Sequence, residues 1–256
     1  MALPKLIQLR DDLQMSTWIL VGACLQASLL IFLPPRVAIA PSFLLLLTRL
    51  FIFLFTRQGL LPDSSLKDSR LGKYTAQIPQ HDGSFSKEPS DQDVVVFILG
   101  AQSNHVQGRF APNFLALGDA FGDMWRDLAK NREKNGYLGK TSTLYGTDRD
   151  SGNTAVWISY WTSVEKLHEW ALGPLHKRGM AMFYNKKKST PHIGLMHELY
   201  VVPKKNWENV YYNFTPFGMG QTHPTHKEKS GSFRSVSPLI KADGPTWKSS
   251  GSRMGW

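Results

Sequence analysis

The chain has 256 residues, 42% of them hydrophobic, and its 30 lysine and arginine residues against 20 acidic residues give a net charge of +10 at pH 7. This basic balance raises the question of nucleic acid, but the sequence has no zinc-ligand spacing, helix-turn-helix signal or RNP-like aromatic motif, so we expect no nucleic-acid partner. The single cysteine, Cys24, lies within an apolar run, which excludes an intrachain disulfide and argues against thiolate catalysis.

Two apolar runs open the chain, and each is long enough to cross a bilayer as a helix. The first carries no charge and ends at Pro34-Pro35, which breaks the helical pattern. The second is interrupted only by Arg49, which costs about 2.5–3.5 kcal/mol at mid-span and can be offset by the surrounding Phe, Leu and Ile residues. We therefore predict an N-terminal transmembrane helical hairpin, with helices at about residues 15–34 and 37–56, that forms a membrane anchor over residues 1–57.

Basic residues flank the outer ends of this hairpin, whereas only Arg36 lies in its turn. The positive-inside rule then places both ends, and the domain that follows, on the cytosolic side of a membrane, for which we expect the endoplasmic reticulum. A cleaved signal peptide is the alternative, because Ala38-Ile39-Ala40 resembles a cleavage site. The apolar stretch continues well past that motif, which favours the anchor.

Two polar segments border the aromatic-rich part of the chain. Residues 58–92 are rich in Ser, Asp, Lys, Gln and Pro and are predicted to form a polar linker. Residues 221–256 carry few large apolar side chains and are predicted to form a flexible basic tail. His223 and His226 in this tail are spaced like a weak metal pair but lack further ligands, so we expect no metal site. The segment between them, 93–220, is long enough to bury its own core and is predicted to be the catalytic domain.

The catalytic segment alternates between strand and helix patterns. Continuous β-branched runs are typical of buried strands, whereas Phe114, Leu117 and Phe121 have the spacing of one apolar helix face. Ser163 is suited to cap the second helix, which Gly173-Pro174 ends or kinks. The expected elements are strand 94–99, helix 113–131, strands 138–145 and 154–161, a helix from residue 163 with a second piece over 175–184, and strand 193–202. This βαββαβ order is the ferredoxin-like arrangement, an α+β fold.

Both faces of the predicted strands are apolar, as the alternation of Val94, Val96 and Ile98 with Val95 and Phe97 shows. A sheet with helices on one face is expected to be polar on the other, so the second face must be covered. Two such sheets packed face to face, as in a dimeric α+β barrel, would cover it and make the protein a homodimer. The alternative is a cover formed by the chain's own C-terminal segment.

Histidine and tryptophan residues supply the candidate chemistry. His197 shares a strand face with aliphatic residues, so it is either a buried histidine with a structural partner or a proton shuttle or iron ligand in an apolar pocket. His176 begins a helical piece and lies either on the surface or in a pocket wall. Trp157 and Trp161 are suited either to a core or to an apolar substrate pocket. The absence of a Rossmann glycine pattern, P-loop, GxSxG, HExxH or CxxC motif argues against tight nucleotide binding and triad hydrolysis.

From about residue 94 to residue 220 the sequence resembles a family of monooxygenases built on the dimeric α+β barrel. The resemblance is carried by SYWTSVEKLHEWA, PLHKRGMAMFY and IGLMHELYVVPKKNWENVYYNFTPFGMG. The last of these has the family's closing pattern, a histidine–glutamate pair on the strand followed by a Tyr/Asn/Pro-Phe-Gly segment. A membrane hairpin before such a domain is similar to the membrane-bound monooxygenases of fungal secondary-metabolite pathways, including that of the fumagillin pathway.

The resemblance implies a set of site residues. Those with catalytic roles are His197, His176 and Glu198, and those that contact substrate are Tyr200, Asn213 and Phe217, beside the tryptophans Trp157 and Trp161 that the composition of the pocket suggests.

The function that this resemblance implies is a membrane-anchored monooxygenase acting on an apolar secondary-metabolite intermediate, a terpenoid or a polyketide. The cofactor stays open between none and haem. Without a cofactor, a histidine would take a proton from an acidic substrate carbon before oxygen reacts, and with haem a histidine would ligate the iron. A non-oxidative cyclase, isomerase or dehydratase that uses the same pocket is one alternative, and a membrane-tethered binding protein is another.

Overall fold

The computed structural model describes residues 15–146, 153–186 and 190–256, apart from the side chains of Asn153 and Lys186. The chain divides into two compact units, Met1–Asp68 and Ser69–Trp256. The boundary between them therefore lies inside the segment that was predicted to be a linker.

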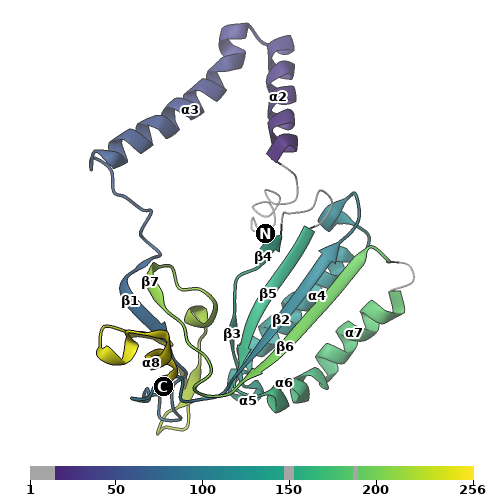
Figure 1. Ribbon diagram of the computed structural model, residues 1–256. Coiled ribbons are helices and arrows are strands. Elements are labelled where there is room, and N and C mark those ends of the chain that lie inside the picture. Colours follow the sequence, from purple (N-terminus) through teal and green to yellow (C-terminus); the bar gives the residue numbers. More distant parts are fainter. Residues whose placement is uncertain (1–14, 147–152, 187–189) are drawn as a thin grey trace. The chain divides into compact units, whose positions relative to one another are not determined.

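The first unit contains the two predicted apolar helices, α2 (Met15–Phe32) and α3 (Pro35–Arg57) (Figure 1). Pro35 occupies the first turn of α3, where its missing N–H costs no helical hydrogen bond. The side chain of Gln26 joins the helices, because its Nε2 donates to the Ala38 carbonyl at 3.0 Å and its Oε1 accepts from Ser42 Oγ at 2.7 Å. Both helices are long and apolar enough to cross a membrane.

The second unit contains an antiparallel sheet of five strands in which the order β3-β5-β2-β6 forms the main path and β4 also pairs with β5. Helices cover one face of this sheet (Figure 1). The strands are β2 (Val94–Ser103), β3 (Tyr137–Lys140), β4 (Leu144–Gly146), β5 (Asn153–Trp161) and β6 (Ile193–Val202), and the helices are α4 (Phe114–Lys130), α5 (Arg132–Asn135), α6 (Val164–Ala171) and α7 (Pro174–Lys186). The order of elements and strands confirms the predicted ferredoxin-like α+β fold.

Local sequence signals account for most of these boundaries. Ser163 caps α6, since its Oγ accepts from the backbone N–H of Lys166 at 3.3 Å. Gly173 separates α6 from α7, which begins at Pro174. The predicted strand 138–145 is instead divided into β3 and β4, both paired with β5.

The helices bury their apolar stripes against one face of the sheet. In α4 the buried side chains recur at helical spacing, at Leu117, Phe121, Met124 and Leu128. They pack against strand residues such as Trp161, which is 2% exposed. This packing is the larger apolar core of the second unit.

A smaller sheet in the order β10-β1-β7 belongs to the same unit. Its strands are β1 (Arg70–Ala76), β7 (Tyr211–Phe214) and β10 (Leu239–Lys241), and the C-terminal region also holds β8 (Thr225–Lys227), β9 (Phe233–Ser235) and α8 (Ser250–Met254). The predictions of a linker over 58–92 and a flexible tail over 221–256 were therefore wrong in these parts. The physical reason is that β1 pairs with residues 239–241, far along the chain, so neither strand is visible in its own local sequence.

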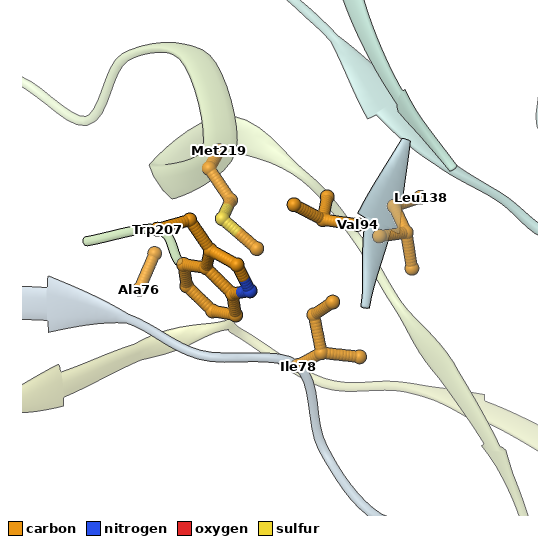
Figure 2. Packing of buried hydrophobic residues seen from close by; sticks show 6 residues of the cluster. All are labelled: Ala76, Ile78, Val94, Leu138, Trp207 and Met219. Atoms are coloured by element: carbon orange, nitrogen blue, oxygen red, sulfur yellow. The ribbon is translucent and has the colours of Figure 1, made fainter. Parts of the chain in front are cut away.

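A second apolar cluster joins these segments to the main sheet. It consists of Ala76, Ile78, Val94, Leu138, Trp207 and Met219 (Figure 2). Two of its members come from the predicted linker, and Trp207 is held by a hydrogen bond from its Nε1 to the Gln92 carbonyl at 2.7 Å. Burial of this cluster explains why polar segments around it adopt ordered structure.

The helix-free face of the main sheet is covered at one end only. There Val94, Tyr160 and Val202 pack with the cluster of Figure 2. Farther along the strands, Met196 remains 45% exposed and Tyr200 50% exposed. Segments from both ends of the second unit, around Ile78 and around Trp207 and Met219, thus cover part of this face and leave an apolar part accessible.

Gly139 offers a test of how β3 meets the segment after β7. Its φ is +150°, and a Cβ there would lie 2.9 Å from the Thr222 Cα. We expect Gly139→Ala to lower the free energy of unfolding of the second unit by about 1–3 kcal/mol. Tryptophan fluorescence of the detergent-solubilised protein during urea unfolding measures this change.

Gly118→Ala is the matched control, because a Cβ at this position in α4 meets nothing within 4 Å. We expect it to raise stability by about 0.5–1 kcal/mol, as alanine is the better helix former. Equal effects of the two substitutions would contradict the close packing at Gly139.

The C-terminal helix offers a test that depends on pH. Arg253 Nε donates to Glu208 Oε2 at 2.5 Å, and this hydrogen bond lowers the pKa of Glu208 below its ordinary value of 4.5. A lowered pKa stabilises the fold above pH 4.5, and this contribution is lost as the pH falls through the folded-state value. We expect Glu208→Gln to reduce stability at pH 7, and the difference from wild type to shrink toward zero in acid.

Unfolding midpoints of both proteins across an acid series measure this difference. Glu88→Gln is the control, because Glu88 and Lys205 form an exposed ion pair whose carboxylate side chain is 66% accessible, and exposed pairs contribute little. A difference that does not change with pH for Glu208→Gln would refute the assigned pKa.

Candidate functional site

A chamber of about 450 Å³ lies between the main sheet and helices α4, α6 and α7. Its size is that of a small-molecule site. Its lining, drawn from the described residues, contains no aspartate, glutamate, lysine or arginine. The polar side chains in the lining are His168, His176 and His197, together with the hydroxyl of Tyr184 and the indoles of three tryptophans, Trp125, Trp161 and Trp170.

His197 projects from β6 into this chamber. Strand alternation places it on the same face as Leu195 and Leu199, which also line the chamber. Its ring lies 5.5 Å from the ring of Phe97, and it makes no hydrogen bond to any residue that the structure describes. The side chain is accessible, so it is not the buried, structurally satisfied histidine that was the alternative.

His176 lies in the first turn of α7, where a backbone carbonyl orients it. Its Nδ1 is 2.8 Å from the carbonyl oxygen of Ala171, at the end of α6. Because a carbonyl can only accept, Nδ1 carries the proton in this contact and Nε2 of the neutral ring is left with a lone pair. The ring also packs on Trp170 at 5.5 Å, and Trp170 Nε1 donates to Asp127 Oδ2 at 2.8 Å. The contact with the Ala171 carbonyl therefore selects the tautomer of the neutral imidazole in which Nε2 is the acceptor.

Two other features of the wall went unrecognised in the sequence. His168, on α6, is exposed but also lies in the lining of the chamber. Gly179, Met180 and Phe183 continue the wall along α7 from His176. They follow His176 by three, four and seven residues, the spacing of one helix face, and this spacing is the signal that could have identified them.

The two predicted pocket tryptophans differ in position. Trp161 lines the chamber and is buried, with its Nε1 donating to Ser159 Oγ at 3.0 Å. Trp157 does not line it, but packs on Phe121 with ring centroids 5.6 Å apart and donates to Thr143 Oγ1 at 2.9 Å. Trp157 thus supports the wall from behind.

Glu198 and Tyr200 lie on the opposite face of β6 from His197. Tyr200 donates its hydroxyl to Glu198 Oε2 at 2.7 Å, and both side chains are exposed. This hydrogen bond raises the pKa of the Tyr200 hydroxyl. The structure therefore does not bring Glu198 or Tyr200 to the chamber, because successive side chains of a strand point to opposite faces.

Asn213 and Phe217 belong to the region of the smaller sheet. Asn213 Oδ1 accepts from the backbone N–H of Gly72 at 2.8 Å, and the Phe217 carbonyl accepts from the Tyr211 hydroxyl at 2.9 Å. Neither residue lines the chamber. Their contacts fix the path of the chain after β7.

The side chains that line the chamber supply few ligands for a metal ion or for haem. Among the residues described, no group of three or more His, Cys, Asp or Glu side chains is placed to hold a metal ion. Either His176 or His197 could supply an axial imidazole to haem. However, haem propionates are carboxylates, and the lining offers no lysine or arginine to pair with them. The chamber fits an uncharged apolar molecule better than haem.

The chamber can be tested by filling it. We expect Leu195→Trp, which places an indole in the chamber, to abolish saturable binding of naphthalene by the detergent-solubilised protein, as measured by calorimetry. Leu172→Trp is the control, since Leu172 is 68% exposed and does not line the chamber. Naphthalene partitions into detergent micelles equally with both variants, so this background cancels in the comparison. Saturable naphthalene binding by Leu195→Trp would count against the chamber.

Comparison with known proteins relates most of the chain to one family. The family described as "Monooxygenase af470-like" matches residues 94–219. The protein named "Monooxygenase af470" from Aspergillus fumigatus is 33% identical over 248 residues, covering 96% of this chain and 89% of that protein. The aligned region is too long to leave out the two apolar helices.

Solved structures resemble the chain more distantly. SnoaB, a cofactor-independent oxygenase from Streptomyces nogalater, is 16% identical with a TM-score of 0.30, over 42% of this chain and 91% of that one. Aldoxime dehydratase in complex with butyraldoxime is 13% identical with a TM-score of 0.38, over 59% of this chain and 41% of that one. From its identity to the Aspergillus fumigatus protein along nearly its whole length, the chain belongs to the monooxygenase af470-like family.

Proposed function

We propose that this protein is a membrane-anchored monooxygenase that oxidises an apolar secondary-metabolite intermediate, a terpenoid or a polyketide, inside the chamber. Membership of the monooxygenase af470-like family supports the reaction class. The observation that carries the proposal is that His176 and His197 line a mostly apolar chamber, with His176 oriented by the Ala171 carbonyl so that Nε2 of the neutral ring can accept a proton.

The lining of the chamber supports an apolar, uncharged substrate. Phenylalanine, leucine, methionine and tryptophan side chains make up most of it. A charged substrate group would lose its hydration there without gaining an ion-pair partner, at a cost of several kcal/mol. An apolar ring system or chain would instead gain from burial of its own surface.

His176 is proposed as the base of a reaction that needs no cofactor. Its Nε2 takes a proton from an acidic carbon or hydroxyl of the substrate, and the apolar surroundings strip water from the resulting anion. This anion supplies two electrons to dioxygen and forms a hydroperoxide at the substrate carbon. Loss of the second C–H of that carbon supplies the other two electrons, so that the O–O bond breaks, one oxygen atom stays as a carbonyl and the other leaves as water. His197, whose ring nitrogens have no protein partner among the described residues, is available to hydrogen-bond the substrate oxygen.

The two apolar helices support the membrane part of the proposal. Both helices, Met15–Phe32 and Pro35–Arg57, are long and apolar enough to cross a membrane. The similarity to the Aspergillus fumigatus protein extends across them. Basic residues at the outer ends of the pair favour a cytosolic domain at the endoplasmic reticulum membrane. An apolar intermediate dissolved in that membrane would be concentrated close to the enzyme.

A homodimer is proposed from the helix-free face of the main sheet. Val96, Ile98 and Ile158 lie on this face beside the exposed Met196 and Tyr200. An accessible apolar sheet face of this kind is stabilised when a second sheet packs on it. A second copy of the chain, facing the first as in a dimeric α+β barrel, would provide that sheet.

Metabolite profiling of a strain that lacks the gene tests the function. We expect an apolar precursor to accumulate, and the missing product to contain one atom of ¹⁸O when wild-type protein is restored under ¹⁸O₂. Restoration with His176→Ala or His197→Ala is expected to lower product formation by about 10²-fold or more, because proton transfer and substrate orientation are lost.

His81→Ala is the matched control, since His81 is exposed on a loop away from the chamber lining. Unfolding midpoints of each variant show whether the fold is retained. Product formation without oxygen would support a cyclase, isomerase or dehydratase instead. Normal product levels with both chamber histidines replaced would support a binding protein.

A further inference from the structure

A second cavity in the sheet-containing unit has a different chemistry from the chamber. This cleft, of about 740 Å³, is lined on one side by β3 and the end of α4, and on the other by residues 216–223 and 235–239. Trp125 lines both the cleft and the chamber. The same indole is therefore a wall of two neighbouring sites.

The lining of the cleft is strongly basic. Arg70, Arg132, Lys140 and His223 line it, whereas no aspartate or glutamate does. None of Arg70, Arg132 and Lys140 forms an ion pair with a carboxylate anywhere in the part of the chain that the structure describes. Cations gathered without counter-charges create a positive potential that attracts anions.

Two of these cations are held in place by contacts with the fold. Arg132 Nε donates to the Ala129 carbonyl at 3.1 Å and one of its terminal nitrogens donates to the His223 carbonyl at 3.0 Å. Lys140 Nζ donates to the Thr141 carbonyl at 3.0 Å and lies 5.4 Å from the centre of the Trp125 ring. Both groups keep further N–H donors for a ligand, and their fixed positions reduce the entropy lost on binding.

Two polar atoms in the lining residues are buried without a partner. The indole nitrogen of Trp125 is a donor and the side-chain oxygen of Gln221 is an acceptor, and neither makes a hydrogen bond within the described residues. Buried polar atoms are normally paired, so each of these two atoms would be stabilised if a small movement of its side chain brought it to a bound ligand. The donor suits an anionic oxygen, and the acceptor suits a ligand that also carries hydroxyl or amine hydrogens.

The pKa values of two basic side chains in the cleft are lowered. Burial lowers the pKa of Lys140, and burial together with the charge of Arg132 lowers the pKa of His223. Both shifts mean that burial disfavours the charged forms of these two side chains. A bound anion would raise both pKa values by compensating that charge.

We propose that this cleft binds an organic phosphate, with Arg70, Arg132 and Lys140 contacting the phosphate oxygens. Guanidinium and ammonium groups are the side chains best suited to phosphate. The serine hydroxyls of Ser142, Ser235 and Ser237 in the lining provide further donors. The phosphate belongs either to a soluble compound or to a lipid headgroup. This site does not depend on the proposed oxygenase reaction.

Calorimetric titration of the detergent-solubilised full chain tests the proposal, with inorganic diphosphate and soluble dihexanoyl phosphatidic acid as separate probes. We expect saturable binding of at least one probe that weakens as salt is raised. Stronger binding of diphosphate identifies a soluble phosphate, and stronger binding of phosphatidic acid identifies a lipid headgroup. Arg132→Gln and Lys140→Gln are each expected to raise the Kd about tenfold or more.

Arg126→Gln is the matched control, because Arg126 is exposed on α4 and pairs with Asp123. Its Kd is expected to match that of wild type. Unfolding midpoints identify any variant that fails to fold. If Arg132→Gln fails to fold because it loses its two hydrogen bonds to backbone carbonyls, Lys140→Gln alone tests the proposal. Failure of both probes to bind wild type at millimolar concentration, or equal affinities of all folded variants, overturns the proposal without bearing on monooxygenase activity.

Discussion

The structure of the second unit depends on a sheet whose central strands, β2 and β5, are apolar on both faces. Such strands are stable only if both faces are withdrawn from water. Helices α4, α6 and α7 cover one face and leave the chamber between themselves and the strands. The smaller sheet and its core around Trp207 cover one end of the other face. The packing of helices α4, α6 and α7 on the sheet therefore sets the position of the chamber.

The division of β6 into two faces determines which predicted residues can act together. His197 enters the chamber, whereas Glu198 and Tyr200 form their own hydrogen bond on the other side of the sheet. His176 reaches the chamber from a different element, and the carbonyl that ends α6 sets its tautomer. A histidine–glutamate pair adjacent in sequence is thus separated in space, while two histidines 21 residues apart in the numbering share one cavity.

The chamber and the basic cleft are two cavities of opposite polarity, and Trp125 lines both of them. The chamber excludes charge, because any ion inside it would lack a partner. The cleft attracts negative charge, because its cations have no carboxylate of their own. If both proposals hold, this chain binds an apolar substrate and an organic phosphate in separate cavities.

The order of strands and helices over residues 94–202 could be predicted from the sequence, because hydrophobic periodicity and signals such as Ser163 and Gly173-Pro174 are local. The two apolar helices were equally evident from composition. The strand face of His197 followed from simple alternation. The smaller sheet could not be predicted, since β7 and β10 are short and β1 is stabilised by pairing with these two strands, both of them far along the chain, and by burial of Ala76.

Local sequence patterns were therefore sufficient for the order of elements in the ferredoxin-like core, for the two apolar helices and for the chemical nature of the candidate residues. Which of those residues come together depends on how the elements pack in three dimensions. This packing brought His176 to the chamber beside His197, placed Asn213 and Phe217 elsewhere, and gathered Arg70, Arg132 and Lys140 into one cleft. The physical reason is that long-range packing sets distances between elements, whereas the pattern of a sequence reports only what each element buries.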